Sequence, residues 1–105
     1  MKRRAPDPRE QEPHDALAGL AQAIARLRDP GQIAAFLQDL CTPAELEAMT
    51  DRWRVVPMLL QGVPYREIHD RTLVSVTTIG RVARTLDHGA GGYAAAIGRG
   101  TDPAR

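Results

Sequence analysis

The stretch YREIHDRTLVSVTTIGRVART, residues Tyr65–Thr85, decides the fold of this chain. Its apolar residues recur at helical spacing on both sides of a short turn, which predicts two helices that meet at a tight corner. The residues expected to face inward are Ile68, Thr72, Val74, Ile79, Val82 and Leu86. This pattern is typical of a helix-turn-helix, whose second helix can enter the major groove of DNA.

The start of the second helix is expected at Ser75, because its hydroxyl can accept a hydrogen bond from the backbone N–H of Thr77 or Thr78. The side chains left outward combine hydroxyl and methyl groups at the tip with guanidinium groups behind them. Such groups suit base edges and phosphates respectively. We therefore predict DNA contacts from Arg66, Ser75, Val76, Thr77, Thr78, Arg81 and Arg84.

Two residues depart from the usual corner of a helix-turn-helix. Leu73 occupies the position where glycine commonly adopts a left-handed conformation, which costs a leucine about 1–2 kcal/mol if it is adopted. His69 stands where many such motifs carry a small alanine, so room must be found for an imidazole. The alternative, two packed helices without a nucleic-acid role, stays open at this point.

Length and composition exclude several classes of function. A chain of 105 residues forms one domain, too small for a larger catalytic fold. Cys41 is the only cysteine, and the three histidines have no metal-ligand spacing with it or with a carboxylate pair. No glycine-rich phosphate loop follows a strand, and no nucleophile has an evident base. We expect no enzyme, and no catalytic residue, metal site or obligatory cofactor.

The charge and the apolar pattern restrict the partners. The net charge is only +1, although arginines are concentrated in and just before the motif. Aromatic residues are too few for a platform on which single-stranded bases stack. The chain has no apolar run of about 20 residues and no hydrophobic leader at its start. We expect a cytoplasmic protein that binds double-stranded DNA and no membrane.

Along the chain, the pattern predicts a disordered arm over residues 1–13, a single helical domain over 14–98 and a flexible tail over 99–105. The domain contains about six short helices, so the predicted fold class is all-α. Asp29-Pro30-Gly31 is expected to stop the first helix. The long helix is expected to begin at Thr42-Pro43, with Thr42 as its N-cap, and to stop at Gly62. Its apolar seam comprises Leu46, Met49, Trp53, Val56 and Leu60, and Pro57 is expected to bend it.

The short helices supply little interior for one copy of the chain. The first two carry apolar stripes that would be buried more fully against a second copy. We therefore expect a homodimer, which would also provide the two-fold symmetry that helix-turn-helix proteins use on palindromic DNA.

The run LCTPAELEAMTDRWRVVPMLLQGVPYREIHDRTLVSVTTIGRVARTLDHGAGGY resembles the Trp repressor superfamily, and its YerC/YecD-type branch in particular. The resemblance covers about Ile33–Ile97. It rests on the TPxE cap after an apolar helix, the Arg-x-Arg of DRWRVV, and YREI followed by S-x-x-T-I-x-R. It implies an all-helical, intertwined homodimer whose helix-turn-helix reads DNA.

In the Trp repressor itself, L-tryptophan binds between the dimer core and the reading head. The resemblance therefore implies effector contacts at the matching positions, which are Thr42, Arg52, Thr78, Arg81 and Thr85. Arg52 and Arg81 would bracket the ligand. Val82 stands where the repressor has a glycine that leaves space for the indole, and this argues against L-tryptophan. Without any effector, Arg52 and Arg81 would form surface ion pairs or phosphate contacts.

The sequence thus favours a sequence-specific transcriptional regulator, a dimeric repressor that reads a palindromic operator and responds to a small effector if one exists. The alternative is a protein-interaction module that uses the same two helices without DNA or effector. The weak net charge favours that alternative a little.

Overall fold

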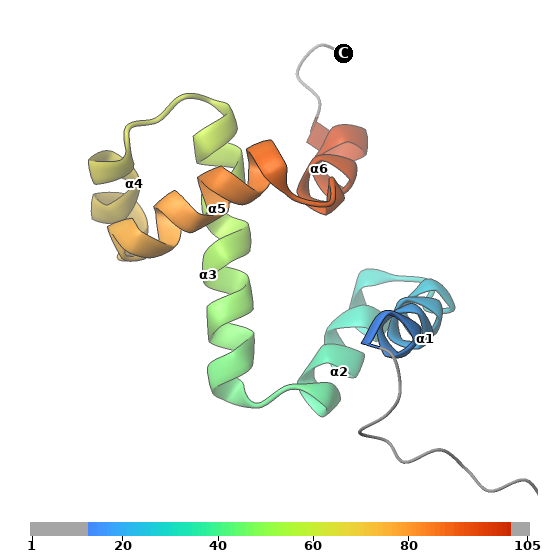
Figure 1. Ribbon diagram of the computed structural model, residues 1–105. Helices are drawn as coiled ribbons and strands as arrows, with labels where there is room; N and C mark the ends of the chain where they lie inside the picture. Colours follow the sequence, from blue (N-terminus) through green and yellow to red (C-terminus); the bar gives the residue numbers. More distant parts are fainter. Residues whose placement is uncertain (1–12, 102–105) are drawn as a thin grey trace, which may run out of the picture. The chain divides into compact units, whose positions relative to one another are not determined.

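The computed structural model describes residues 13–101, with backbone only for His14 and for 99–101. This part of the chain holds six helices and no strand, so the all-α prediction is confirmed (Figure 1). The helices are α1 (Pro13–Ala25), α2 (Pro30–Leu40), α3 (Pro43–Leu60), α4 (Tyr65–Thr72), α5 (Val76–His88) and α6 (Gly92–Thr101).

The ends of the helical region differ slightly from the predicted boundaries. The first helix begins at Pro13 rather than at residue 14, because proline suits the first turn of a helix. The last helix continues to Thr101, three residues beyond the predicted end at 98. The rest of the predicted arm and tail, residues 1–12 and 102–105, lies outside the described residues.

The chain divides into two compact units between Thr42 and Pro43. The first unit contains α1 and α2. Asp29 caps α2 by accepting the backbone N–H of Gln32 at 2.8 Å, and Pro30 occupies the first turn. Asp29-Pro30-Gly31 therefore starts the second helix in addition to separating it from the first. Neither Leu17, which is 66% exposed, nor Leu40, which is 52% exposed, finds an apolar partner that covers it.

The second unit, α3 to α6, contains the core. Its buried side chains come from α3, α4, α5 and the corner, and they are Val55, Val56, Ile68, Val74, Ile79 and Val82. Leu86, Tyr93 and Ile97 pack at the edge of this cluster. The predicted inward face of the helix-turn-helix is therefore confirmed, with Thr72 half-buried at its margin.

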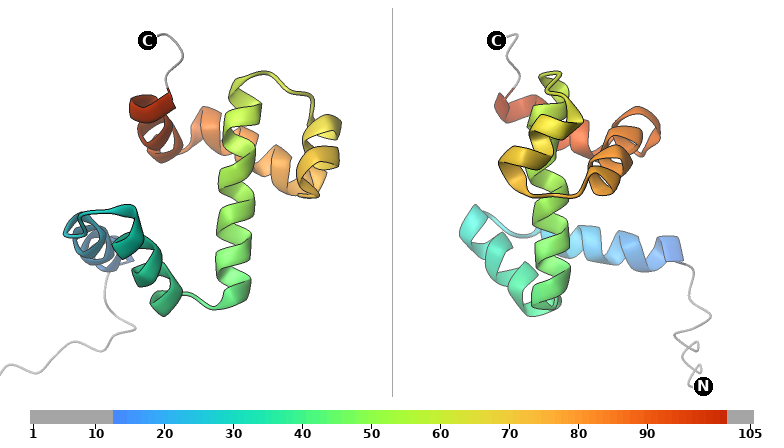
Figure 2. Two further views of the ribbon diagram at one scale, coloured as in Figure 1. Left: turned by 180° about the vertical axis from the view of Figure 1, so that it is seen from behind. Right: turned by 90° about the vertical axis from the view of Figure 1, so that its left-hand side faces the viewer.

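The predicted seam of α3 is only partly correct. Val56 is buried as expected, but Val55 beside it is also buried, while Met49, Trp53 and Leu60 stay exposed. The reason is that α4 and α5 pack against α3, and their position determines which side chains of α3 are covered. Despite Pro57, α3 remains one uninterrupted helix to Leu60 (Figure 2).

A hydrogen-bonded stop ends α3 as predicted. Gly62 has a φ of 80°, and its N–H donates to the carbonyl of Leu59 at 3.0 Å. The N–H of Val63 reaches back to the carbonyl of Met58 at 3.0 Å. This is a Schellman motif, in which the left-handed residue is normally glycine. It fixes the direction in which the chain enters α4.

Candidate nucleic-acid interface

The corner between α4 and α5 adopts the strained backbone that the sequence suggested. Leu73 has φ 65° and ψ 8°, the left-handed region, and its N–H donates to the carbonyl of His69 at 2.7 Å. It is the only described residue other than glycine with a positive φ. Its side chain is 80% exposed, so packing of the side chain does not explain the conformation.

Two side chains of α4 hold this corner in place. The hydroxyl of Thr72 donates to the carbonyl of Ile68 at 2.7 Å and accepts the N–H of Val74 at 3.1 Å. The Nδ1 of His69 lies 2.8 Å from the carbonyl oxygen of Val74. Because a carbonyl can only accept, Nδ1 must carry a proton. Both backbone polar groups of the buried Val74 are therefore satisfied by side chains of the preceding helix.

The sequence indicated only that room must be found for the imidazole of His69, so this hydrogen bond was not predicted. The signal that could have found it is local. A side chain near the end of a helix is well placed to reach the backbone just after that helix. Where many such motifs carry a small alanine, this chain has an imidazole whose hydrogen bond stabilises the turn.

The start of α5 is capped as predicted. The Oγ of Ser75 accepts the N–H of Thr78 at 3.1 Å, and its hydroxyl donates to the Oγ1 of Thr78 at 3.0 Å. These two predicted DNA contacts are therefore joined to each other. In this arrangement the hydroxyl proton of Thr78 remains available, whereas the proton of Ser75 is used.

The outward face of α5 presents the predicted combination of groups. Val76 is 50% exposed, and Thr77, Arg81 and Arg84 are also exposed. Positions 77, 81, 84 and 88 are separated by four, three and four residues, so they share one face of the helix. His88 therefore belongs to the same face, although it was not predicted.

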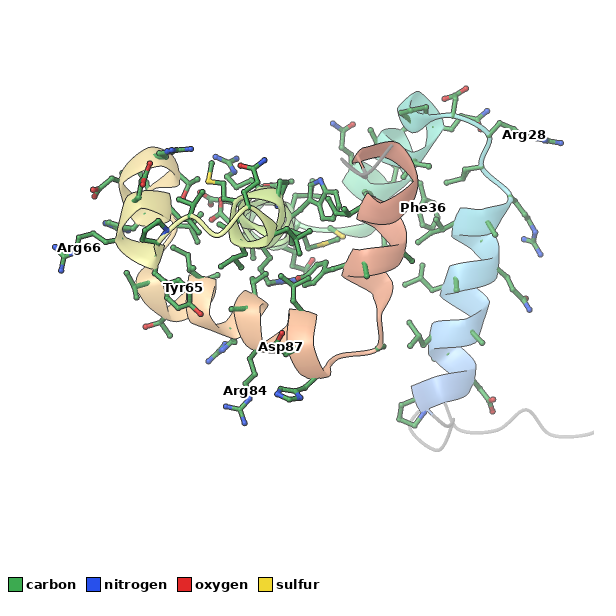
Figure 3. The ribbon with its side chains drawn as sticks, turned by 90° about the horizontal axis from the view of Figure 1, so that it is seen from above. Arg28, Phe36, Tyr65, Arg66, Arg84 and Asp87 are labelled. Atoms are coloured by element: carbon green, nitrogen blue, oxygen red, sulfur yellow. The ribbon has the colours of Figure 1, made fainter. Side chains whose placement is uncertain are left out.

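The arginines of this interface carry no carboxylate partner among the described side chains. The ion pairs in that part of the structure join Arg54 to Asp51 at 4.0 Å and Arg71 to Glu67. Figure 3 shows Arg66 extending from α4 and Arg84 extending from α5, each away from the helix that carries it. The guanidinium groups of Arg66, Arg81 and Arg84 are thus available for an anionic partner, unlike that of Arg71.

A small cavity beside this face brings together three of the five predicted effector residues. It measures about 110 Å³ and is lined by Arg52, Arg81, Val82, Thr85 and Tyr93. Thr78 is not among its lining residues. Thr42 immediately precedes α3 and belongs to the first compact unit. Its place in an effector site stays a prediction.

Val82 and Tyr93 form two of the walls of this cavity. Val82 is 1% exposed and belongs to the core, so it closes the cavity from inside. Tyr93 comes from α6 and was not predicted to line a site. Its ring lies 6.3 Å from that of Trp53, centroid to centroid, and is tilted by 36°. Sequence reasoning could not find it, because only the packing of α6 on α3 places it there.

Other kinds of site are not evident within residues 13–101. The histidine, cysteine and carboxylate side chains described there form no group of three that could hold a metal ion. None of the helices described there has both the length and the apolar character needed to cross a membrane.

Comparison with known proteins identifies proteins that resemble this chain in sequence and in fold. The family model described as Trp repressor protein matches residues 15–101. YerC of Bacillus subtilis (strain 168), an uncharacterized protein, is 36% identical over 80 residues, which cover 76% of this chain and 77% of YerC. A crystal structure of a TrpR-like protein from Eubacterium eligens ATCC 27750 is 35% identical, with a TM-score of 0.74. That match covers 81% of this chain and 88% of the other.

Proposed function

Because the chain belongs to the Trp repressor family, we propose that it is a dimeric transcriptional repressor that reads a palindromic operator through α4 and α5. One observation carries the proposal. The exposed face of α5 places the hydroxyl of Thr77 ahead of the unpaired guanidinium groups of Arg81 and Arg84. Base edges accept the first kind of group, and phosphates accept the second.

The dimer part of this proposal is supported by the first two helices. They carry apolar residues at helical spacing, yet no residue of α2 is buried, and Leu17 of α1 is two-thirds exposed. A second copy of the chain would cover these stripes and would set two reading heads on adjacent turns of the duplex, about 34 Å apart.

Sedimentation equilibrium tests the dimer directly. The full chain should sediment as a dimer at micromolar concentration, and Leu17→Glu should shift it toward monomer because the charge would be buried in the interface. The matched control is Leu73→Glu, which changes an even more exposed leucine at the corner and should leave the dimer intact. A monomeric wild type would contradict this part.

DNA binding is tested on a duplex from the region upstream of the protein's own gene. Affinity should fall steeply as salt is raised, because bound phosphates release counterions, and it should exceed affinity for a scrambled duplex. Binding without salt dependence and without sequence preference would refute the proposal.

Single substitutions separate the roles on α5. Arg84→Ala should weaken binding to every duplex and reduce the salt slope by about one. Thr77→Ala should mainly relax the preference between sequences. Arg71→Ala is the matched control, since Arg71 is already paired with Glu67 and should contribute little. The reverse pattern for Arg84 and Thr77 would reject these assignments.

We propose further that an effector, if the protein uses one, binds with its anionic group at Arg52 and Arg81, with Thr85 beside it in the lining, where the Thr85 hydroxyl donates to the carbonyl of Arg81 at 3.0 Å. The cavity of about 110 Å³ is well below the roughly 300 Å³ at which pockets for drug-sized ligands begin. The position of Val82 also disfavours the indole of L-tryptophan. Isothermal titration with L-tryptophan, followed by a panel of small metabolites, tests this. A clear response to L-tryptophan would show that Val82 does not exclude it.

The second candidate is a protein-interaction module that docks through α4 and α5. The net charge of only +1 favours this alternative a little. Pull-down after nuclease treatment distinguishes the two, because a DNA-dependent partner is lost and a direct protein partner is retained.

A further inference from the structure

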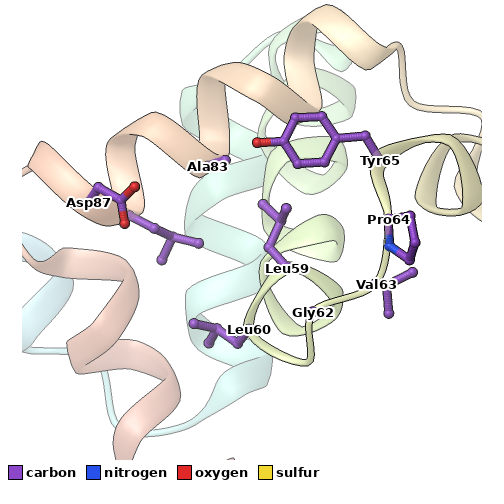
Figure 4. Close-up of a pocket in the computed structure, with 9 residues that line it drawn as sticks. Leu59, Leu60, Gly62, Val63, Pro64, Tyr65, Ala83 and Asp87 are labelled. Atoms are coloured by element: carbon purple, nitrogen blue, oxygen red, sulfur yellow. The ribbon is translucent and has the colours of Figure 1, made fainter.

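A second and larger cavity lies on the other flank of α5. It has a volume of about 430 Å³, within the roughly 300–1,000 Å³ typical of small-molecule sites. It lies between the last turn of α3, the link to α4 and the second half of α5 (Figure 4). Its lining residues are Leu59, Leu60, Gly62, Val63, Pro64, Tyr65, Ala83, Leu86 and Asp87.

The walls of this cavity are held by the backbone and by one aromatic ring. The Schellman motif at Gly62 fixes the link, since the N–H of Val63 is bonded to the carbonyl of Met58. The ring of Tyr65 lies against α5 at Gly80, where an added Cβ would be 3.9 Å from the ring's Cε2. That distance is an ordinary van der Waals contact, so the ring of Tyr65 would also fit beside a Cβ at position 80. The cavity therefore exists without a ligand to shape it.

Backbone polar groups also line the cavity, and its side chains are apolar apart from one charge and one phenol. Asp87 supplies the only charged side chain of the lining, and it has no ion pair or hydrogen bond with another described side chain. Figure 4 shows Asp87 and Tyr65 on either side of Ala83, with the Tyr65 hydroxyl directed toward the α5 side. A carboxylate at this place accepts hydrogen bonds only, and the face of a tyrosine ring attracts a cation.

The helix ends add to this negative character. Asp87 lies in the last turn of α5, and Leu59 and Leu60 lie in the last turn of α3, so two helix C-termini border the cavity. Each carries a partial negative charge. The N-terminus of α4 at Tyr65 carries a partial positive charge. The two helix C-termini and the full charge of the Asp87 carboxylate outweigh it, so the charge around the cavity is negative.

We propose that this cavity binds a small organic amine, in which a protonated nitrogen meets Asp87 and an apolar body lies against Leu59, Val63 and the ring of Tyr65. The site is distinct from the cavity at Arg52 and Arg81. On α5 it uses the strip of Ala83 and Asp87, whereas the exposed face at positions 77, 81 and 84 lies beside it. A ligand here touches α3, α4 and α5 without occupying a guanidinium group.

The test is isothermal titration of the full chain at pH 7 with phenethylamine, whose primary amine is protonated at that pH. Phenylacetate is the matched probe, because it carries the same ring with the opposite charge. Phenethylamine should bind at least about tenfold more tightly than phenylacetate, since a charge-assisted bond to Asp87 is available only to the cation.

Two variants assign the binding to this cavity. Asp87→Asn keeps the shape and should weaken phenethylamine about tenfold, whereas Asp70→Asn removes the same charge from an exposed position on α4 and should change nothing. Ala83→Leu should abolish binding by filling the space, with a thermal melt to show that it folds. Absence of phenethylamine binding, equal binding of both probes, or unchanged binding by Asp87→Asn would overturn the proposal.

Discussion

Leu73→Gly should stabilise the protein although it removes a large apolar side chain. The left-handed conformation observed at Leu73 costs a residue with a Cβ about 1–2 kcal/mol, and glycine avoids this cost. Glycine loses about 0.5–1 kcal/mol more conformational entropy on folding. The leucine side chain is 80% exposed, so its removal costs little packing. The net gain is about 0.5–1 kcal/mol.

The assay is thermal unfolding followed by circular dichroism at one fixed protein concentration, because oligomerisation makes the midpoint concentration-dependent. A gain of that size raises the midpoint by about 2–8 °C in a domain of this length. Leu73→Ala is the matched control. It removes the same side chain beyond Cβ but keeps the Cβ that makes the conformation costly, and it should stay within about 0.5 kcal/mol of wild type. A Leu73→Gly variant no more stable than Leu73→Ala would refute the strain argument.

Three further substitutions test the local bonds by the same unfolding measurement. His69→Ala should cost about 1–2 kcal/mol, because the carbonyl of the buried Val74 loses its donor; a loss too small to measure would contradict the corner bond. Ser75→Ala should cost about 1 kcal/mol through loss of the N-cap bond to Thr78, and an unchanged midpoint would reject that bond as a stabilising one. Gly62→Ala should destabilise by about 1 kcal/mol through the backbone alone, since nothing lies within 4 Å of the added Cβ. A neutral Gly62→Ala would weaken the reasoning at Leu73 as well.

The parts of the fold that could be predicted are those in which the residue that determines a feature lies within a few positions of that feature in the chain. Ser75 caps the helix that begins one residue later, and Gly62 stops the helix that ends two residues before it. Pro43 begins α3 because its missing N–H is not needed in the first turn. Each of these bonds spans only a few residues, so the sequence pattern contains both partners.

The parts that could not be predicted depend on which distant element covers a residue. The apolar spacing of α3 marked Trp53 and Leu60 as seam residues, yet they are 42% and 54% exposed while Val55 is fully buried. Periodicity shows which residues are apolar and share a face. It does not show where along that face α4 and α5 pack, or that Tyr93 of α6 reaches the ring of Trp53.

The two cavities would influence DNA binding by different physical routes. A ligand at Arg52 and Arg81 contacts the guanidinium of Arg81, which also belongs to the exposed face of α5. The charge of such a ligand therefore acts directly on the electrostatic attraction between that face and DNA phosphates. An amine at Asp87 leaves the guanidinium groups unoccupied and acts through the packing of α5 on the end of α3. Either ligand can shift DNA affinity only if its own affinity differs between the arrangement of the helices that binds DNA and the arrangement that does not. Salt dependence separates the two routes, because only the first changes the number of phosphate contacts and hence the slope.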